Sequence, residues 1–305
     1  MLNTAESQSA SIATWIDSDI RKLSMELGER NDGSSDRGRR LRAALDHVST
    51  IFREAGRDPT EVGSTMIDGN GLLNVECTVP GTRNSEQHVV LGAHIDSARG
   101  APGADDNASG VAMLLGLARV LGTRRFPRTV HLVAFVNEEP PHTRRPTMGS
   151  LDYARQLRRR GIDVTCMVSL ESLGFDPAAR PQDARWIGRR FGGLYFVSNL
   201  ASRQWCDLAH RAFRHACGMS ALRIAAPGFL PGIRSSDHWS FWKMGFPAIM
   251  VTDGGPLVYK HYHRPSDTAE KVDVAKLVRM VPGMMSMLAR LAGVPVCGVM
   301  KPPSV

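Results

Sequence analysis

The stretch HVVLGAHIDSARGAPGADDNASG, residues 88–110, decides how this chain folds. It begins with an apolar, β-branched run, passes through a glycine-rich loop and ends where a second apolar run starts. The first run predicts a buried strand and the second predicts a helix. Polar residues gather between them: His94 and Asp96 close the strand, and Asp105 and Asp106 precede the helix. A strand and a helix joined in this way are the building unit of α/β proteins.

The rest of the chain repeats this alternation of strands and helices. Short runs rich in β-branched residues predict strands at 88–96, 129–139, 164–172, 194–199 and 246–253. Between them, apolar residues at helical spacing predict helices at 108–122, 148–161, 202–217 and 267–292. We therefore expect an α/β fold, a three-layer α/β/α sandwich around a mixed, mostly parallel sheet.

The N-terminal part has a different pattern. Two amphipathic helices are predicted between residues 11 and 56, and alternating residues at 61–81 around Asp68-Gly69-Asn70-Gly71 predict a β-hairpin. The chain contains no internal repeat, and only the end, KPPSV, has the composition of a tail. We expect one catalytic domain over 1–305, with a helical segment at about 11–56 and a short tail at 296–305.

Composition narrows the class of protein. With 305 residues, 42% of them hydrophobic, the chain can bury a large core, and no apolar run is long enough to span a membrane. The net charge is +8, but the arginine clusters at 37–42 and 155–161 contain no interleaved aromatic residues, so we expect no nucleic-acid partner. Five scattered cysteines without a CxxC pair argue against a thiolate zinc site. The N-terminus shows no secretory leader, so we expect a cytoplasmic protein, and a processed, secreted form stays open.

Polar side chains recur where the predicted strands end. His94 and Asp96 end one strand, Glu138 and Glu139 the next, and Glu171 a third. In open α/β sheets, ligands bind at this edge. Taken singly, Asp105 and Asp106 fit helix capping, and a lone histidine fits a packed core.

Together these residues indicate a metal centre. Near the C-terminus, KHYHRPSDT adds His261 and His263. The expected metal ligands are His94, Asp106, Glu139, Glu171 and His263. Imidazole and carboxylate ligands without thiolates suit catalytic zinc. Asp96 can orient the His94 ring, and Glu138, which points away from Glu139 in extended backbone, can act as a general base.

Five blocks of the sequence resemble a known family. GAHIDS…PGADDNASG, FVNEE, SLESLG, SDHWSFWKMGFPAIMVTD and YHRPSDT occur in the order seen in the co-catalytic dizinc peptidases of the leucyl aminopeptidase and glutaminyl cyclase type. Glutamate carboxypeptidase and the transferrin receptor ectodomain are similar to these. The resemblance covers roughly residues 20 to 292. It implies a hydrolase of the phosphorylase/hydrolase-like zinc-peptidase fold.

The resemblance also implies a role for each site residue. Asp106 would bridge two zinc ions, with His94 and Glu171 on one ion and Glu139 and His263 on the other. Glu138 would be the general base, and Asp96 would orient His94. Co²⁺ or Mn²⁺ would be possible substitutes for zinc.

The sequence departs from the family pattern at two places. Glu171 stands where many members carry aspartate, so its arm is one methylene longer. The segment PPHTRRPTMGS, which follows the glutamates, is longer than usual and is expected to reshape the substrate pocket through His142, Arg144 or Arg145.

A second segment is expected to line the substrate pocket. RSSDHWSFWKMGFP, residues 234–247, would place Asp237 and His238 near the reacting carbonyl as substrate-binding residues. Trp239, Phe241 or Trp242 would form an apolar wall, and a packed loop with core aromatics is the alternative for each of them.

The expected function is zinc-dependent aminopeptidase activity on peptides with a free N-terminus. Three alternatives stay open. A glutaminyl cyclase would use one zinc ion for intramolecular acyl transfer, and a carboxypeptidase would need a basic clamp such as Arg203 or Arg234. A metal-free binding module would be expected to have lost ligands and base, and here none is lost. The sequence predicts neither the oligomeric state nor the side-chain preference.

Overall fold

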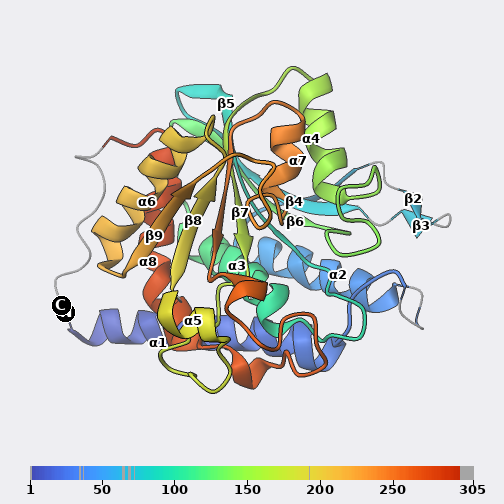
Figure 1. The fold of residues 1–305 in the computed structure, drawn as a ribbon. Helices are drawn as coiled ribbons and strands as arrows, with labels where there is room; N and C mark the ends of the chain where they lie inside the picture. Colours follow the sequence, from blue (N-terminus) through green and yellow to red (C-terminus); the bar gives the residue numbers. More distant parts are fainter. Residues whose placement is uncertain are drawn as a thin grey trace.

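An eight-stranded sheet forms the centre of the computed structural model, which describes residues 2–33, 36, 38–63, 66–67, 70–71, 73–191 and 193–295 (Figure 1). In spatial order its strands are β1 (Pro59–Val62), β4 (Asn74–Val79), β6 (Arg128–Phe135), β5 (Asn84–His94), β7 (Asp163–Glu171), β10 (Ala248–Thr252), β8 (Leu194–Ser198) and β9 (Ala221–Ala225). A two-stranded ribbon, β2 (Met66–Ile67) and β3 (Asn70–Gly71), is separate from this sheet.

The middle of the sheet is parallel. β6, β5, β7 and β10 run in the same direction, whereas β1, β4 and β8 join by antiparallel pairing and β9 pairs parallel to β8. The carboxyl ends of the four central strands therefore lie at one edge of the sheet. This confirms the predicted mixed, mostly parallel sheet.

Helices cover both faces of the sheet (Figure 1). One layer contains α1 (Leu2–Arg21), continued by a π-helical segment (Lys22–Leu27), α2 (Arg39–Glu54), α3 (Gly110–Leu121), α6 (Arg203–Cys217) and α8 (Val274–Leu291). The other layer contains α4 (Gly149–Arg159) and α7 (His238–Lys243). A short helix, α5 (Trp186–Phe191), follows the loop after β7. The predicted three-layer sandwich is thus confirmed.

The alternation of side chains along β5 explains why both faces need a cover. Val89, Leu91 and Ala93 pack into the larger helical layer, while Val90 packs with the α4 and α7 layer, and all four are fully buried. Strands buried on both faces read as continuous apolar runs, which is how this strand appears in the sequence.

Most predicted elements are present, and their differences from prediction lie at the ends. The N-terminal helix begins at Leu2, well before the predicted start, and the last helix begins at Val274, because the Asp273 carboxylate accepts the Lys276 N–H and caps it there. The predicted hairpin is confirmed in the pairing of β2 with β3, although its turn, 68–69, lies outside the described residues. The predicted tail, 296–305, also lies outside them. Among the helices that are described, none has the length and apolarity needed to cross a membrane.

Strands β5 and β6 carry a pair of histidines, His88 partly buried and His131 buried, that makes stability depend on pH. His88 Nδ1 lies 2.7 Å from His131 Nε2, and their rings stack. Burial lowers the pKa of His88 to about 4, and the charges of His131 and Arg160 lower it further. The carboxylates of Asp163 and Glu76 act in the opposite direction. In the unfolded chain a histidine has a pKa near ~6.5. The difference between the folded and unfolded pKa therefore contributes fully to the stability of the fold above pH ~6.5, and this contribution is lost as the pH falls towards 4.

We therefore expect His88→Gln to lose less stability on acidification than the unchanged protein. Between pH 7 and pH 5 the fall in Tm should be smaller by roughly 1–3 °C, a small effect because the ring is partly exposed. Thermal unfolding followed by circular dichroism would measure it, with the exposed His215→Gln as the control. Identical pH profiles for both variants would contradict the expectation.

Candidate metal centre

The predicted ligands come together at the carboxyl edge of the central strands. His94 ends β5 and Glu171 ends β7, Glu139 follows β6, and Asp106 lies in the loop before α3. His263, in the loop before α8, completes the set. Parallel strands place these ends side by side, so ligands distant in sequence meet in space.

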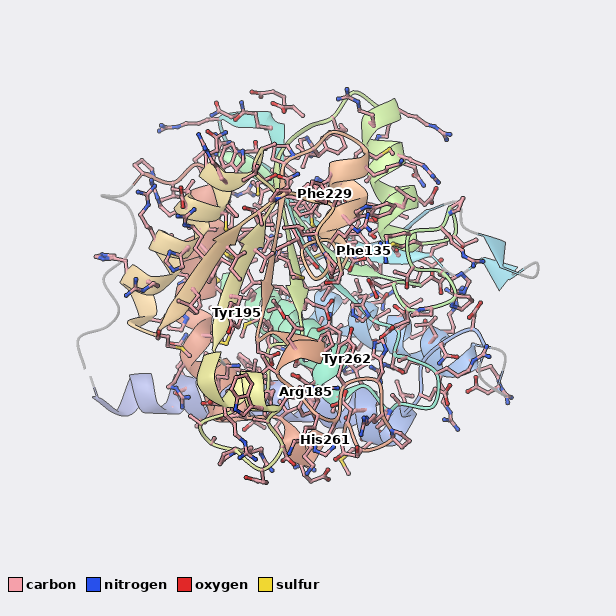
Figure 2. The ribbon with its side chains drawn as sticks, viewed as in Figure 1. Phe135, Arg185, Tyr195, Phe229, His261 and Tyr262 are labelled. Atoms are coloured by element: carbon pink, nitrogen blue, oxygen red, sulfur yellow. The ribbon has the colours of Figure 1, made fainter. Side chains whose placement is uncertain are left out.

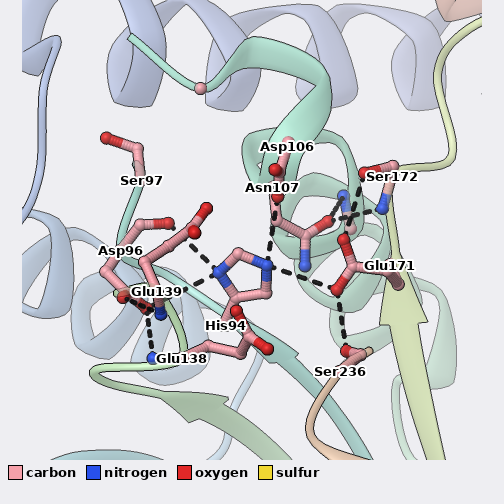
Figure 3. A network of polar contacts seen from close by, with 12 residues as sticks. His94, Asp96, Ser97, Asp106, Asn107, Glu138, Glu139, Glu171, Ser172 and Ser236 are labelled. Atoms are coloured by element: carbon pink, nitrogen blue, oxygen red, sulfur yellow. Dashed lines mark hydrogen bonds and ion pairs between the residues drawn. The ribbon is translucent and has the colours of Figure 1, made fainter. Parts of the chain in front are cut away.

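Two groups of ligand atoms share Asp106, and Figure 3 shows the one formed by His94, Asp106 and Glu171. His94 Nε2 lies 3.2 Å from Asp106 Oδ1 and 3.3 Å from Glu171 Oε2. His263 Nε2 lies 3.0 Å from the other oxygen, Asp106 Oδ2, and 3.1 Å from Glu139 Oε2. Each group holds three ligand atoms within 4.8 Å of one another. A third group of this kind, His94, Glu138 and Glu139, overlaps both.

The polar atoms of this cluster fit a cation. In the described part of the chain, His94 Nε2, both Asp106 oxygens and Glu139 Oε1 are buried without a hydrogen bond. Buried polar groups are normally hydrogen-bonded, so four unsatisfied atoms that converge on one place indicate a ligand. Imidazole and carboxylate donors suit zinc.

Charge in the cluster is unbalanced, which also points to a cation. Burial raises the pKa of Glu139 to about 7, and the Asp106 carboxylate adds to this shift. For Asp106, burial is outweighed by His263 and His94, which hold its pKa well below the usual value. For His94, burial is outweighed by Glu171, Asp106 and Asp96, which raise its pKa. Bound cations would relieve the repulsion among these carboxylates.

Backbone anchors hold Asp106 in the shared position. The Asp267 carboxylate accepts the N–H groups of Asp105 and Asp106, at 3.0 and 3.2 Å. The Asn107 side chain donates to Leu170 O and accepts the Ser172 N–H, which ties this loop to the end of β7. Asp105 neither caps the helix nor joins the ligand groups, because its carboxylate accepts the Gly174 N–H at 2.7 Å.

Glycines permit the close approach of this loop. A Cβ at Gly110 would lie 2.8 Å from Leu170 O. Gly103 has a φ of +63°, and a Cβ there would lie 2.4 Å from Asp106 O. Left-handed backbone also occurs at the predicted ligand His263 and at two residues near other ligands in the chain, Asn137 and Ser172. Such conformations cluster at functional sites.

Asp96 has a second task that the sequence did not reveal. Its carboxylate lies 3.5 Å from His94 Nδ1, and its carbonyl oxygen lies 3.2 Å from the same nitrogen. The same carboxylate accepts the N–H groups of Glu138 and Glu139, at 3.1 and 2.9 Å. It therefore positions both glutamates as well as the His94 ring.

The longer arm of Glu171 is held by hydroxyl groups. Ser236 donates to Glu171 Oε2 at 2.7 Å, and Ser172 donates to Oε1 at 3.1 Å. Ser236 comes from the segment that precedes α7, so its role depends on a contact between distant parts of the chain.

His261 lies in the same loop as His263 but outside the ligand groups. Its ring pairs with Asp183 and Ser266.

Glu138 is a buried carboxylate beside the ligands that belongs to neither of the two groups sharing Asp106. Burial raises its pKa well above the usual value, and the charges of nearby Glu139, Glu171 and Asp237 raise it further. His94 acts in the opposite direction. Its carbonyl oxygen accepts a hydrogen bond from Thr143 Oγ1 at 2.6 Å. Its place beside the ligands fits the predicted base, which stays a prediction.

The predicted substrate-binding pair is buried and does not line the apolar pocket described below. Asp237 and His238 are both fully buried at the start of α7. Burial raises the pKa of Asp237 to about 7 and lowers that of His238 to about 4. His238 Nε2 lies 2.7 Å from Ile233 O. Contact of either residue with substrate stays a prediction.

An apolar pocket of about 260 Å³ opens beside Glu171. None of the expected wall residues, Trp239, Phe241 and Trp242, lines this pocket. Phe241 is buried in the core against α4, and Trp242 donates to Ala248 O. Instead, the lining comes from the ends of β8, β9 and β10 and from two loops. It includes Tyr195, Val197, Ile224, Met250 and Tyr262.

Tyr262 links the pocket to the metal centre. Its ring stacks on His263 with 4.0 Å between centroids, and it lines the pocket beside Glu171. Tyr195 lies at the same end of the sheet (Figure 2). Sequence reasoning missed both tyrosines, although the position of Tyr262 directly before a predicted ligand was an available signal.

The long loop after Glu139 docks on the N-terminal segment. His142 Nε2 lies 2.8 Å from Asp32 Oδ2, and its Nδ1 lies 2.8 Å from Thr147 Oγ1. Arg144 and Arg145 are exposed. None of the three is among the residues that line the apolar pocket.

Comparison with known proteins identifies a family that this chain resembles over most of its length. The model of a family described as peptidase family M28 matches residues 74–288. The uncharacterized protein YfbL of Escherichia coli K12 is 37% identical over 290 residues, which cover 90% of this chain and 86% of that protein. A probable leucine aminopeptidase of Trichophyton verrucosum is 28% identical over 248 residues, 75% of this chain and 60% of that protein.

Solved structures show the same fold. An aminopeptidase from Aneurinibacillus sp. strain AM-1 matches with a TM-score of 0.69 at 18% identity, and the match covers 96% of each chain. A glutaminyl cyclase from Bacteroides thetaiotaomicron matches with a TM-score of 0.66 at 14% identity, covering 92% of this chain and 97% of that one.

Proposed function

We propose that this chain, which belongs to peptidase family M28 and is a zinc metallopeptidase, removes N-terminal residues from peptides at a site that holds two zinc ions. One observation carries the proposal. Asp106 belongs to both ligand groups. One of its carboxylate oxygens faces His94, and the other faces His263. A carboxylate with one oxygen in each group is suited to bridge a pair of ions.

The described residues include five candidate ligands, and Glu138 lies beside them outside the two groups that share Asp106. His94, Asp106 and Glu171 would hold one ion, and Asp106, Glu139 and His263 the other. When bound, zinc supplies Lewis-acid chemistry, which polarises the scissile carbonyl and makes water a better nucleophile.

Glu138 would carry the proton. As the water oxygen bonds to the carbonyl carbon, a Glu138 carboxylate oxygen takes up its proton. The same group then donates this proton to the leaving nitrogen as the carbon–nitrogen bond breaks. Asp96 supports the transfer because its carboxylate fixes the backbone of Glu138.

The apolar pocket beside Glu171 would accept the side chain of the N-terminal residue. Its lining, as far as the chain is described, contains no arginine or lysine. An apolar lining favours leucine-like side chains over acidic ones. It also offers no clamp for a substrate carboxylate, which favours an aminopeptidase over a carboxypeptidase.

Hydrolysis of aminoacyl p-nitroanilides by the purified protein tests this function. We expect turnover of the leucyl substrate, loss of turnover after chelation, and recovery with about two equivalents of zinc. Acetyl-leucyl p-nitroanilide, which lacks the free amine, is the matched control and should stay intact. Metal content should be measured on the same sample.

Other outcomes would replace the proposal. Release of a cyclised product from peptides with N-terminal glutamine, with one zinc ion bound, would identify a glutaminyl cyclase. Cleavage of N-terminally blocked peptides from their C-terminus would identify a carboxypeptidase. A protein that binds no zinc would contradict both the metal centre and the peptidase mechanism.

The pocket makes a further prediction about specificity. Ile224 on β9 lines the pocket and is 37% exposed, so a charge can be placed there without burying it fully. Ile224→Asp should lower kcat/KM for the leucyl substrate about tenfold and raise it for the lysyl substrate, because an apolar contact is lost and a charge gained.

A matched control lies on the same strand. Leu222 is 51% exposed and is not among the residues that line the pocket. Leu222→Asp should therefore leave the leucyl-to-lysyl ratio unchanged. Equal ratios in both variants and the unchanged protein would show that another surface receives the side chain.

A further inference from the structure

Arg30 is a fully buried guanidinium in the N-terminal segment, outside the part of the chain that the family model matches. It follows the π-helical end of the first helix. Its N–H groups point to five backbone carbonyl oxygens. Nε donates to Ile95 O at 3.0 Å, Nη1 to Leu23 O, Gly28 O and Pro102 O at 2.8, 2.8 and 2.6 Å, and Nη2 to Gly103 O at 3.1 Å.

Three of these carbonyls belong to one loop. Ile95, Pro102 and Gly103 all lie between His94 and Asp106, the two residues that meet in one ligand group. The guanidinium therefore bonds the beginning and the end of this loop at once. Its planar, forked donors suit that task, and a single ammonium group could not reach all of these acceptors.

The Arg30 backbone holds the same loop in the middle. Its N–H donates to Ser97 Oγ at 3.0 Å, and its carbonyl oxygen accepts the Ser97 N–H at 2.9 Å. Ser97 Oγ in turn donates to Ala101 O at 2.9 Å. Ser97 directly follows Asp96 in the chain and is drawn with His94 and Asp96 in Figure 3.

The charge of Arg30 does not explain its presence. Burial lowers its pKa to about 10, although the carboxylates of Asp96 and Asp267 act to raise it. The guanidinium therefore stays positive at neutral pH. In the described residues it forms no ion pair with a carboxylate, and a buried positive charge near the cluster would repel zinc. What the side chain offers the site is therefore its hydrogen bonds.

We propose that Arg30 is a positioning residue, which fixes the spacing of His94 and Asp106 by bonding both ends of the loop between them. This inference rests on the proposed function in one respect, since it takes His94 and Asp106 as zinc ligands. It makes the N-terminal segment part of the catalytic unit.

Zinc affinity, measured by competition with a chromophoric chelator, tests this role. Arg30→Met should lower zinc affinity about 10–100-fold, the range for lost support of a ligand. Arg30→Lys keeps the charge and part of the bonding, so it should recover part of that loss. The kcat of the zinc-saturated variants should fall in the same order, with KM within about threefold.

The matched control is a partly buried arginine in the helical layer on the same side of the sheet. Arg119 on α3 pairs with Asp19 on α1, at 2.6 Å, and makes no bond to the loop. Arg119→Met should lower Tm but leave zinc affinity within about twofold. If Arg30→Met does not fold, Ser97→Ala removes one anchor of the loop and should lower zinc affinity about three- to tenfold.

Two results would overturn the inference. Zinc affinity that is unchanged or higher in Arg30→Met would mean that Arg30 acts through its charge or not at all. A loss no larger than that of Arg119→Met would mean that it supports only the fold. An unchanged protein that binds zinc but cleaves no peptide would refute the proposed function and leave the affinity test of Arg30 valid.

Discussion

Glu138→Gln is expected to lower kcat by roughly 10²–10⁴-fold while zinc content stays at two ions, because general acid–base catalysis contributes a factor of this size. Glutamine keeps the shape of the side chain and removes the site that takes up the proton. The backbone would stay in place, since the Glu138 N–H is held by Asp96 and its carbonyl by Thr143.

The structure also explains why zinc should be retained. The two groups that share Asp106 use His94, Glu171, Glu139 and His263, and none of these is altered. Metal analysis together with turnover of leucyl p-nitroanilide would measure both effects on one sample.

Glu139→Gln is the contrasting variant. Glu139 Oε2 lies 3.1 Å from His263 Nε2, so its loss should lower zinc content as well as kcat. If Glu138→Gln keeps more than about a tenth of the activity, another group accepts the proton. If it loses zinc, Glu138 is a ligand, as the third group with His94 and Glu139 would allow.

Three of the five ligands could be predicted from the sequence because each has a local signal. His94, Glu139 and Glu171 end or follow apolar runs, and the carboxyl ends of parallel strands share one edge. The approach of these three in space needed only the fold class, whereas Asp106 and His263 lie in loops away from the strand ends. The structure brings all five predicted ligands together. Their binding of zinc stays a prediction, which metal analysis of the purified protein would test.

Other parts of the site could not be predicted, because they depend on contacts between distant segments. Arg30 reads as one of many arginines until the loop at 95–103 is seen to fold around it. The pocket is lined from the ends of β8, β9 and β10, whose order in the sheet the sequence does not give. For the same reason, the aromatic residues of 239–242 were expected in the pocket, whereas Phe241 is packed in the core.

Asp106→Asn is expected to have the largest effect on the metal centre. We expect zinc content to fall from two ions to one at most and kcat to fall by about 10³-fold or more, since the two-metal clamp on the reacting oxygens is lost. Asp106 is the one residue with an oxygen in each group, 3.2 Å from His94 Nε2 and 3.0 Å from His263 Nε2. An asparagine can offer its oxygen to only one of them, and its amide is neutral.

The neighbouring residue provides a strict control for this substitution. Asp105 is equally buried, but its carboxylate accepts the Gly174 N–H instead of facing the ligand groups. Asp105→Asn should cost about 1–3 kcal/mol of stability, because a buried hydrogen bond is weakened, and should keep two zinc ions. Metal analysis and thermal unfolding of both variants would separate loss of fold from loss of the bridge. Two retained ions and normal turnover in Asp106→Asn would exclude Asp106 as the bridging ligand, whereas zinc loss confined to Asp106→Asn would place the bridge at this carboxylate.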